Sequence, residues 1–201
     1  HTPRDVDGVL RWDLATLESG IRQGLGTLAT GDTDIASVGV DAWGVDYGLL
    51  DASGELLGQP FCYRDARTEA VRDTVLSAVT EEELFATTGL QQLPFNTIYQ
   101  LAAETSLADA ATLLLLPDLL GYWLTGEVGA EVTNASTTQL YDVRRHAWAT
   151  GLAERVDVPV RLLPPLREPG DLVGRLRPQV AEEVGLPAGT PVVAVGSHDT
   201  A

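Results

Sequence analysis

The segment that most constrains the fold is the uninterrupted apolar run Pro191-Val-Val-Ala-Val-Gly196, close to the end of the 201-residue chain. A run without polar alternation is typical of a strand inside a sheet that is covered on both faces. It leads directly into the polar residues Ser197 to Thr200. In α/β folds ligands bind at the carboxyl ends of such strands. This end of the run is therefore the first place to look for chemistry.

The first third of the chain combines one helical pattern with strand-like segments. Apolar residues recur at helical spacing from Asp13, a candidate cap, to about Thr30. Short strand-like segments follow at 35–40, at 45–50 and from 51 toward Tyr63, separated by turn-forming residues. Together with the buried run near the end, this order predicts an α/β or α+β domain.

Helix signals dominate the middle of the chain. Thr80-Glu-Glu-Glu83 has the pattern of a capping box, Asn96 is a candidate cap for the next segment, and Pro117 is placed as the first-turn proline of a helix that Gly126 ends. The remaining expectations are a β-prone piece at 137–143, a helix through Trp148, Leu152 and Val156, an irregular proline-rich connection at 159–169, and a short helix at 178–186 that Gly185 ends.

The charged residues exclude several classes of protein. All 13 basic residues are arginine, so no mechanism that needs a lysine within this chain is available, including the phosphate-binding lysine of P-loop proteins and the Schiff base. With 29 acidic residues the formal charge is −16, which repels phosphate backbones. We therefore expect no nucleic-acid partner.

The longest apolar stretch, Leu113 to Leu124, contains Pro117 and Asp118 and is too short to cross a bilayer. We expect no membrane partner. The single cysteine, Cys62, and the absence of a leading signal pattern favour the cytoplasm. The chain contains no methionine and begins at His1, which we interpret as a piece of a longer protein.

Three familiar kinds of site do not fit the sequence. Ser197, His198 and Asp199 are neighbours on a strand, so their side chains alternate between faces and cannot form a proton relay. The three histidines are not paired at ligand spacing, which argues against a protein-held transition metal. The glycines at 20–31 do not match a dinucleotide fingerprint.

A set of polar residues at strand ends and turns remains after these exclusions: Asp41, Asp46, Asp199 and the segment Tyr63 to Arg67. An acidic residue at a turn is ordinarily a cap or a solvated ion pair. Asp199 differs because a carboxylate beside a histidine and a threonine, at the mouth of a buried strand, can accept a proton from a bound hydroxyl. Gly44 beside Trp43 is either an ordinary turn glycine next to a core aromatic residue or a point where a ligand approaches the backbone. Both interpretations stay open from the residues alone.

Eight sequence blocks occur in one order along nearly the whole chain: Arg11-Trp-Asp13; Val40-Asp-Ala-Trp-Gly-Val-Asp46; Tyr63-Arg-Asp-Ala-Arg-Thr68; Leu93-Pro-Phe-Asn-Thr-Ile-Tyr-Gln-Leu101; Leu116-Pro-Asp118; Tyr122-Trp-Leu-Thr-Gly126; Thr133-Asn-Ala-Ser-Thr-Thr-Gln-Leu140; and Ser197-His-Asp-Thr-Ala201. Together they resemble the N-terminal domain of the FGGY carbohydrate kinases, and most closely the L-rhamnulose kinase branch of that family.

The resemblance implies an α/β fold: a ribonuclease-H-like (actin-like ATPase) domain with helical insertions, incomplete at its N-terminal hairpin. Residues 1–201 would be the sugar-binding side, with a phosphate-loop hairpin before them and a nucleotide domain after them. The implied reaction is ATP-dependent phosphorylation of L-rhamnulose at O1, with ATP and Mg²⁺ as cofactors and a small sugar as partner. By resemblance, Asp199 is the base, and Gly44, His198, Asp199 and Thr200 line the sugar pocket. Asp65, Asn96 and Tyr99 are further candidates.

Two alternatives stay open. The first is an FGGY kinase for another ketose, such as L-fuculose or L-xylulose. The second is a non-catalytic sugar-sensing or actin-like module. Under the kinase interpretation we expect the 201-residue chain by itself to be inactive, because the nucleotide half would lie outside it.

Overall fold

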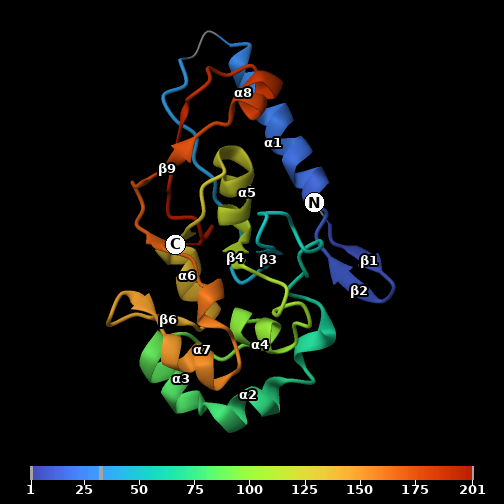
Figure 1. The fold of residues 1–201 in the computed structure, drawn as a ribbon, viewed down its shortest axis with the longest axis vertical. Coiled ribbons are helices and arrows are strands. Elements are labelled where there is room, and N and C mark those ends of the chain that lie inside the picture. The colour runs from blue at the N-terminus through green and yellow to red at the C-terminus, as the bar shows by residue number, and fades with distance from the viewer. Residues whose placement is uncertain (1, 32–33, 201) are drawn as a thin grey trace.

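The computed structural model describes residues 2–31 and 34–200, so features that involve His1, Asp32, Thr33 or Ala201 lie outside the described residues. Helices and short strands alternate along this chain (Figure 1). The α-helices are α1 (Leu14–Ala29), α2 (Arg72–Ala78), α3 (Glu81–Thr88), α4 (Thr97–Ala102), α5 (Leu116–Thr125), α6 (Val132–Ala135), α7 (Thr150–Arg155) and α8 (Pro178–Val184). Short 3₁₀ helices lie at Ala66–Thr68, Ser136–Thr138 and Val160–Leu162.

The strands form pairs rather than one wide sheet within the described ranges. They are β1 (Arg4–Val6), β2 (Val9–Arg11), β3 (Tyr47–Leu50), β4 (Thr112–Leu115), β5 (Ala130–Glu131), β6 (Tyr141–Asp142), β7 (Ala147–Trp148), β8 (Leu166–Arg167), β9 (Leu172–Arg175) and β10 (Pro191–Val193). Of the strands in residues 2–31 and 34–200, only β5 and β8 pair in parallel; β1 with β2, β3 with β4, β6 with β7, and β9 with β10 are antiparallel. These pairs are joined further by isolated bridges, including parallel bridges from Val38 to Val192 and from Ala42 to His198.

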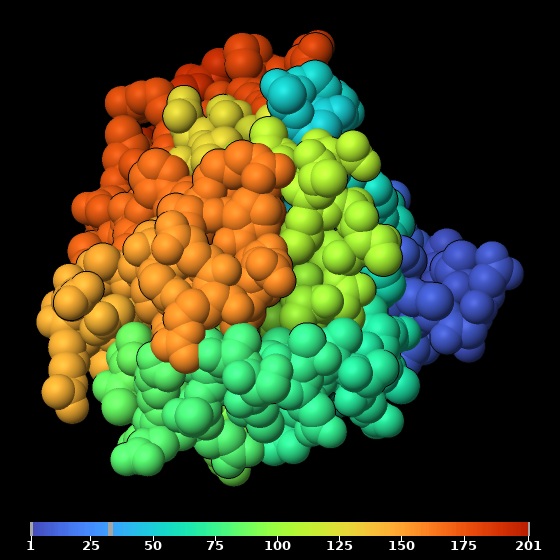
Figure 2. Space-filling view, turned by 60° about the horizontal axis from the view of Figure 1, so that its bottom comes forward, coloured from blue at the N-terminus to red at the C-terminus, as the bar shows by residue number. Residues whose placement is uncertain are grey.

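Strand β4 divides the apolar core. Its side chains alternate between two faces, so Leu113 and Leu115 enter the largest cluster, whereas Leu114 packs with Leu14 and Leu116 in another. The largest cluster is surrounded by α2, α3, α4 and α7, and the segments of α2 and α3 run across the face that Figure 2 brings forward. A further cluster joins α1 and α8 with Val38 and Val192. This last cluster therefore holds the Val38 and Val192 segments together.

Most helix boundaries follow the local sequence signals. Asp13 caps α1 by accepting a hydrogen bond from the backbone N–H of Thr16, and Thr80 caps α3 by accepting one from Glu83. Pro117 lies in the first turn of α5, and Gly126 ends that helix in the left-handed conformation, which glycine tolerates. These predictions are confirmed.

The predicted strand at 35–40 is wrong as a regular strand. The described part of this segment makes only the single bridge at Val38. Gly39 explains part of the irregularity, because a Cβ there would lie 2.7 Å from Val195 Cγ1. The neighbouring strand β10 is shorter than the predicted run at 191–196, because it ends at Val193, and its register against β9 shifts between Val192 and Val193. The two segments are thus in close but uneven contact.

Four smaller expectations are corrected. The β-prone piece at 137–143 is split between a 3₁₀ helix and β6. Trp148 belongs to β7, so the helix predicted around it begins only at Thr150. The proline-rich connection at 159–169 contains a 3₁₀ turn and β8. Asn96 stands at the cap position of α4, but its side chain makes no capping bond and donates to the carbonyl of Gln91 instead.

No helix in the described ranges combines the length and the apolar character that a bilayer crossing requires.

Candidate functional site

Asp199 lies beside the turn that contains Ala42, Trp43 and Gly44. The backbone N–H of Asp199 donates to the carbonyl of Ala42 at 2.9 Å, and the N–H of Ala42 donates to the carbonyl of Ser197 at 3.0 Å. Parallel pairing of the segments around 38–42 and 192–199 produces this arrangement. The structure therefore brings together two segments that are more than 150 residues apart in the sequence.

The Asp199 carboxyl group is accessible. Its side chain is 51% exposed, and its Oδ1 lies 3.9 Å from Nε2 of His198. Thr200 Oγ1 lies 3.0 Å from the same nitrogen. Asp199 also lines a groove of about 850 Å³ between α1 and the 38–43 segment, together with Asp41 and Trp43. A carboxylate in this position can take up a proton from a molecule in the groove.

The close approach at Gly44 is made by the chain itself. A Cβ on Gly44 would lie 2.8 Å from Cγ2 of Thr137, and the hydroxyl of Thr137 accepts a hydrogen bond from the N–H of Val45 at 3.0 Å. Val45 has φ of +67°, a conformation that β-branched residues rarely adopt. Gly44 is thus required by packing against Thr137, and contact with a sugar stays a prediction.

A buried carboxyl group holds the same turn from behind. Oδ2 of Asp46 accepts hydrogen bonds from the indole N–H groups of Trp12 at 2.5 Å and Trp43 at 2.9 Å. Oδ1 accepts from the side-chain amide of Gln100 at 3.1 Å. Asp46 is fully buried, and this desolvation raises the pKa of its carboxyl group above the ordinary value although the hydrogen bonds oppose the shift.

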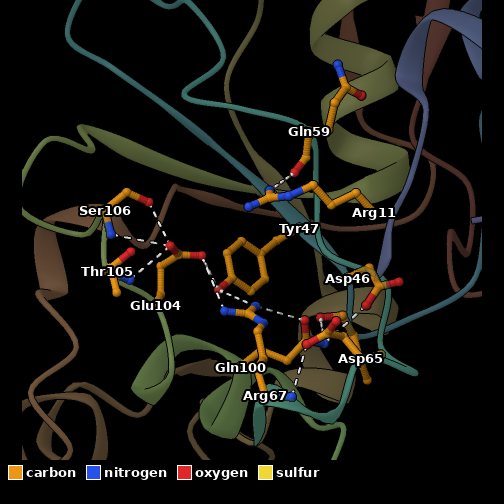
Figure 3. A network of polar contacts seen from close by, with 11 residues as sticks. Arg11, Asp46, Tyr47, Gln59, Asp65, Arg67, Gln100, Glu104, Thr105 and Ser106 are labelled. Carbon is orange, nitrogen blue, oxygen red and sulfur yellow. Dashed lines mark hydrogen bonds and ion pairs between the residues drawn. The ribbon is translucent and has the colours of Figure 1, made fainter. Parts of the chain in front are cut away.

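The contacts continue from Asp46 to a buried ion pair (Figure 3). Oε1 of Gln100 accepts from the Arg67 guanidinium at 3.5 Å, and Arg67 pairs with Glu104 at 3.5 Å. Arg67 also lies over the ring of Phe61, 3.5 Å from its centroid. Sequence inspection did not identify this network, because its members are scattered between residues 46 and 104. The turn at Trp43 is consequently joined to the interior by polar contacts as well as packing.

The further candidates Asp65, Asn96 and Tyr99 do not line the groove beside Asp199. Asp65 accepts from the backbone N–H groups of Leu10 and Arg67, at 2.8 Å and 3.0 Å. Asn96 and Tyr99 are each 1% exposed. Each of the three side chains makes a hydrogen bond within the protein, Tyr99 with the side chain of Gln92. Their part in sugar binding stays a prediction.

Two neighbouring acids, the buried Glu131 and the half-buried Asp118, lie behind Ser197. Glu131 accepts hydrogen bonds from the N–H and the hydroxyl of Ser197, at 2.9 Å and 2.7 Å. The N–H of Glu131 in turn donates to Oδ1 of Asp118 at 3.1 Å, while Oδ2 of Asp118 is buried and has no hydrogen-bond partner in the part of the chain that the structure describes. Burial raises the pKa of Asp118 to about 8. Sequence inspection missed Glu131 because nothing local links it to Ser197.

Within the described residues, no group of three or more histidine, cysteine, aspartate or glutamate side chains is arranged to hold a metal ion by itself. Among the described residues, the groove beside Asp199 is lined by two carboxyl groups, from Asp41 and Asp199, and by no basic side chain.

Comparisons with known proteins agree on one family. Residues 6–201 match the model of the N-terminal domain of the FGGY family of carbohydrate kinases. A rhamnulokinase of Yersinia pestis (strain Pestoides F) is 40% identical over 203 residues, covering 98% of this chain and 41% of that protein. A rhamnulokinase of Enterococcus faecalis (strain ATCC 700802 / V583) is 43% identical over 197 residues, covering 97% and 40%. The chain thus spans about two fifths of the length of these relatives.

The same fold is found among solved structures. The ligand-bound xylulose kinase from Lactobacillus acidophilus superposes with a TM-score of 0.86 over 96% of this chain and 41% of that chain. The sequence identity is 16%, so this likeness shows the fold alone. It confirms the predicted α/β fold class.

Replacing Asp46 by asparagine is expected to destabilise the protein. In either orientation the new amide group points a donor at the donors of Trp12, Trp43 or Gln100. Leaving buried donors without an acceptor costs about 1–3 kcal/mol. Urea unfolding followed by far-ultraviolet circular dichroism measures the loss. The exposed Asp109→Asn serves as the control and should change the free energy of unfolding by less than about 0.5 kcal/mol; equal effects of the two substitutions would contradict the argument.

Replacing Asp118 by asparagine is expected to flatten the dependence of stability on pH. The folded protein keeps the Asp118 proton up to about pH 8, whereas the unfolded chain loses it near the ordinary value of 3.8. Wild-type stability therefore falls as pH rises through this window. The variant has no such proton, and its amide oxygen can still accept from Glu131. Melting temperatures at pH 5 and pH 8 should differ less for Asp118→Asn than for the wild type, and an unchanged difference would argue against a protonated Asp118.

Proposed function

Because the chain belongs to the FGGY family of carbohydrate kinases, we propose that its full-length protein transfers the γ-phosphoryl group of ATP to O1 of L-rhamnulose. The identity of 40–43% to rhamnulokinases over nearly the whole chain carries this proposal. The accessible carboxyl group of Asp199 beside the Ala42 to Gly44 turn supports it. Residues 1–201 would form the sugar-binding side of the enzyme.

In the proposed reaction Asp199 is the general base. The bond between O1 of the sugar and the γ-phosphorus forms while the bond from that phosphorus to the leaving oxygen of ADP breaks. Asp199 accepts the proton of the O1 hydroxyl as the charge on that oxygen develops. General-base assistance of this kind contributes about 10²–10⁴-fold to the rate. Gly44, His198 and Thr200 would orient the sugar so that its hydroxyl lies in line with the phosphorus.

The groove fits a magnesium ion better than it fits a triphosphate. Mg²⁺ is commonly held by one or two protein carboxylates and the substrate phosphates, and Asp41 is a carboxylate on the groove wall beside Asp199. When bound, the metal would neutralise charge on the transferred phosphoryl group. No basic side chain in the described ranges lines this groove to pair with the phosphates. We therefore place the main ATP contacts in the part of the enzyme that corresponds to the remaining length of its relatives.

The same groove has an apolar wall next to an open backbone edge. Leu17, Ile21 and Leu25 of α1 face it. Val38 and Ala42 direct backbone groups toward the 191–199 segment. The alternate residues Gly39 and Asp41 make no backbone hydrogen bond of that kind. An added strand would satisfy this edge, so we propose that the phosphate-loop hairpin of the full-length kinase lies here.

Replacing Asp199 by asparagine in the full-length protein is expected to lower turnover by about 10²–10⁴-fold while sugar binding persists, because asparagine keeps the shape but cannot accept the proton. A coupled ADP-release assay on L-rhamnulose, L-fuculose and L-xylulose gives both the turnover and the preferred ketose, and calorimetric titration gives sugar affinity. Asp109→Asn is the matched control. Near-normal turnover of Asp199→Asn would remove Asp199 from the role of base, and a preference for another ketose would correct the substrate.

The 201-residue chain alone is expected to show no ketose phosphorylation. The Asp199 side chain is half exposed here, and phosphoryl transfer in a site open to water favours hydrolysis over transfer to the sugar. The ADP-release assay on the purified chain, with the full-length protein as reference, tests this. Sugar-dependent turnover by the chain alone would overturn the proposal that the main ATP contacts lie outside residues 1–201.

A further inference from the structure

Glu131 caps helix α6, but this role explains only some of the hydrogen bonds that its carboxyl group accepts. It is 2% exposed, and its two carboxyl oxygens accept five hydrogen bonds. Three come from Thr133 and Asn134 at the start of α6, as expected for a residue that caps a helix. The other two come from Ser197, 66 residues further along the chain. Capping requires none of the contacts with Ser197.

The side chains next to Glu131 hold the following residues of the same loop. The hydroxyl of Thr133 donates to Glu131 at 2.5 Å and accepts from the backbone N–H of His198 at 3.3 Å. The side-chain amide of Asn134 donates to the carbonyl of Ser197 at 3.4 Å. In Figure 1 the end of the described chain accordingly lies next to α6.

The loop is thus held from two sides immediately before Asp199. On one side Ala42 bonds the carbonyl of Ser197 and the N–H of Asp199. On the other side Glu131 takes the N–H of Ser197 and, through Thr133, the N–H of His198. Each of these backbone groups has a partner, although Asp199 itself has an exposed side chain. The backbone of the loop is therefore held by the groups on both sides of it, whereas the Asp199 side chain is left accessible.

We propose that Glu131 is a positioning residue for phosphoryl transfer: it fixes the peptide groups of Ser197 and His198 and thereby the direction of the Asp199 carboxyl group. This inference rests on the proposed function. Glu131 touches neither the groove nor Asp199 in the hydrogen bonds of the described residues, so it acts only through the loop. Misplacing a reacting group by about 1 Å can cost about 10²-fold in rate.

The substitution that tests the proposal is Glu131→Gln in the full-length protein. The amide nitrogen must face either the N–H of Thr133 or the donors of Ser197, so one side of the network is broken in each orientation. We expect kcat to fall by about tenfold or more, with KM for the sugar changing less than about threefold. Glu127→Gln, an exposed glutamate of the same segment, is the control and should leave both constants unchanged.

A double-mutant cycle with Asp199→Asn separates positioning from general destabilisation. If Glu131 acts through Asp199, adding Glu131→Gln to Asp199→Asn should lower the residual kcat by less than about twofold, because the group being positioned is already disabled. An equal fold-loss in both backgrounds, or no loss in the wild-type background, would overturn the proposal. A wild-type protein with no ketose kinase activity would instead overturn the proposed function.

A second pair of variants covers the case in which Glu131→Gln does not fold. Thr133→Val removes the hydroxyl between Glu131 and His198, and Thr133→Ser retains it. We expect Thr133→Val to lower kcat and to speed amide hydrogen exchange in peptides that contain Ser197 and His198, and Thr133→Ser to restore both. Unchanged exchange and kcat in Thr133→Val would also overturn the role assigned to this network.

Discussion

The parallel contact between the 38–42 segment and the 191–199 segment is the constraint on which the rest of the candidate site depends. It joins Val38 to Val192 and Ala42 to His198, and it is supported by the apolar cluster that α1 and α8 share with these segments. Without it Asp199 would have no fixed relation to the Trp43 turn. Both segments are irregular and share isolated bridges instead of a continuous ladder of backbone hydrogen bonds. Side chains from elsewhere in the chain therefore help to hold them in place.

Several of those contacts are made by buried acidic side chains, whose hydrogen-bond donors are mostly uncharged groups. Asp46 is satisfied by two indole groups and an amide, and Glu131 by backbone groups and hydroxyls. A buried carboxylate is tolerated when such donors surround it. The chain has 29 acidic and 13 basic residues, so these buried acids do not each need an arginine partner. Arg67 instead contacts Phe61 and Glu104. Around the candidate site, the buried carboxyl groups are thus stabilised mainly by hydrogen bonds from uncharged donors.

The sequence predicted what is decided locally. The caps at Asp13 and Thr80 and the ends of α5 depend on neighbours within one turn, and they are confirmed. The segment at 35–40 has the composition of a strand, yet it makes a single bridge, at Val38, and its Gly39 lies against the side chain of Val195. Glu131 has no local signal at all, because its partner is 66 residues away. The family resemblance indicated Asp199, but the contacts of Glu131 and Thr133 with the residues before Asp199 are visible only in the folded structure.

Trp12 and Trp43 donate to the same carboxyl oxygen of Asp46, and this arrangement affects the fluorescence and absorption of the two indoles. Their ring centroids lie 4.4 Å apart, and both indoles donate to the one buried oxygen of Asp46, which fixes their mutual orientation. Trp43 also borders the groove that Asp199 lines. A molecule that enters the groove would perturb the emission and the coupled near-ultraviolet absorption of this pair. The protein therefore carries a built-in spectroscopic reporter, at the wall of its own candidate site, that needs no attached dye.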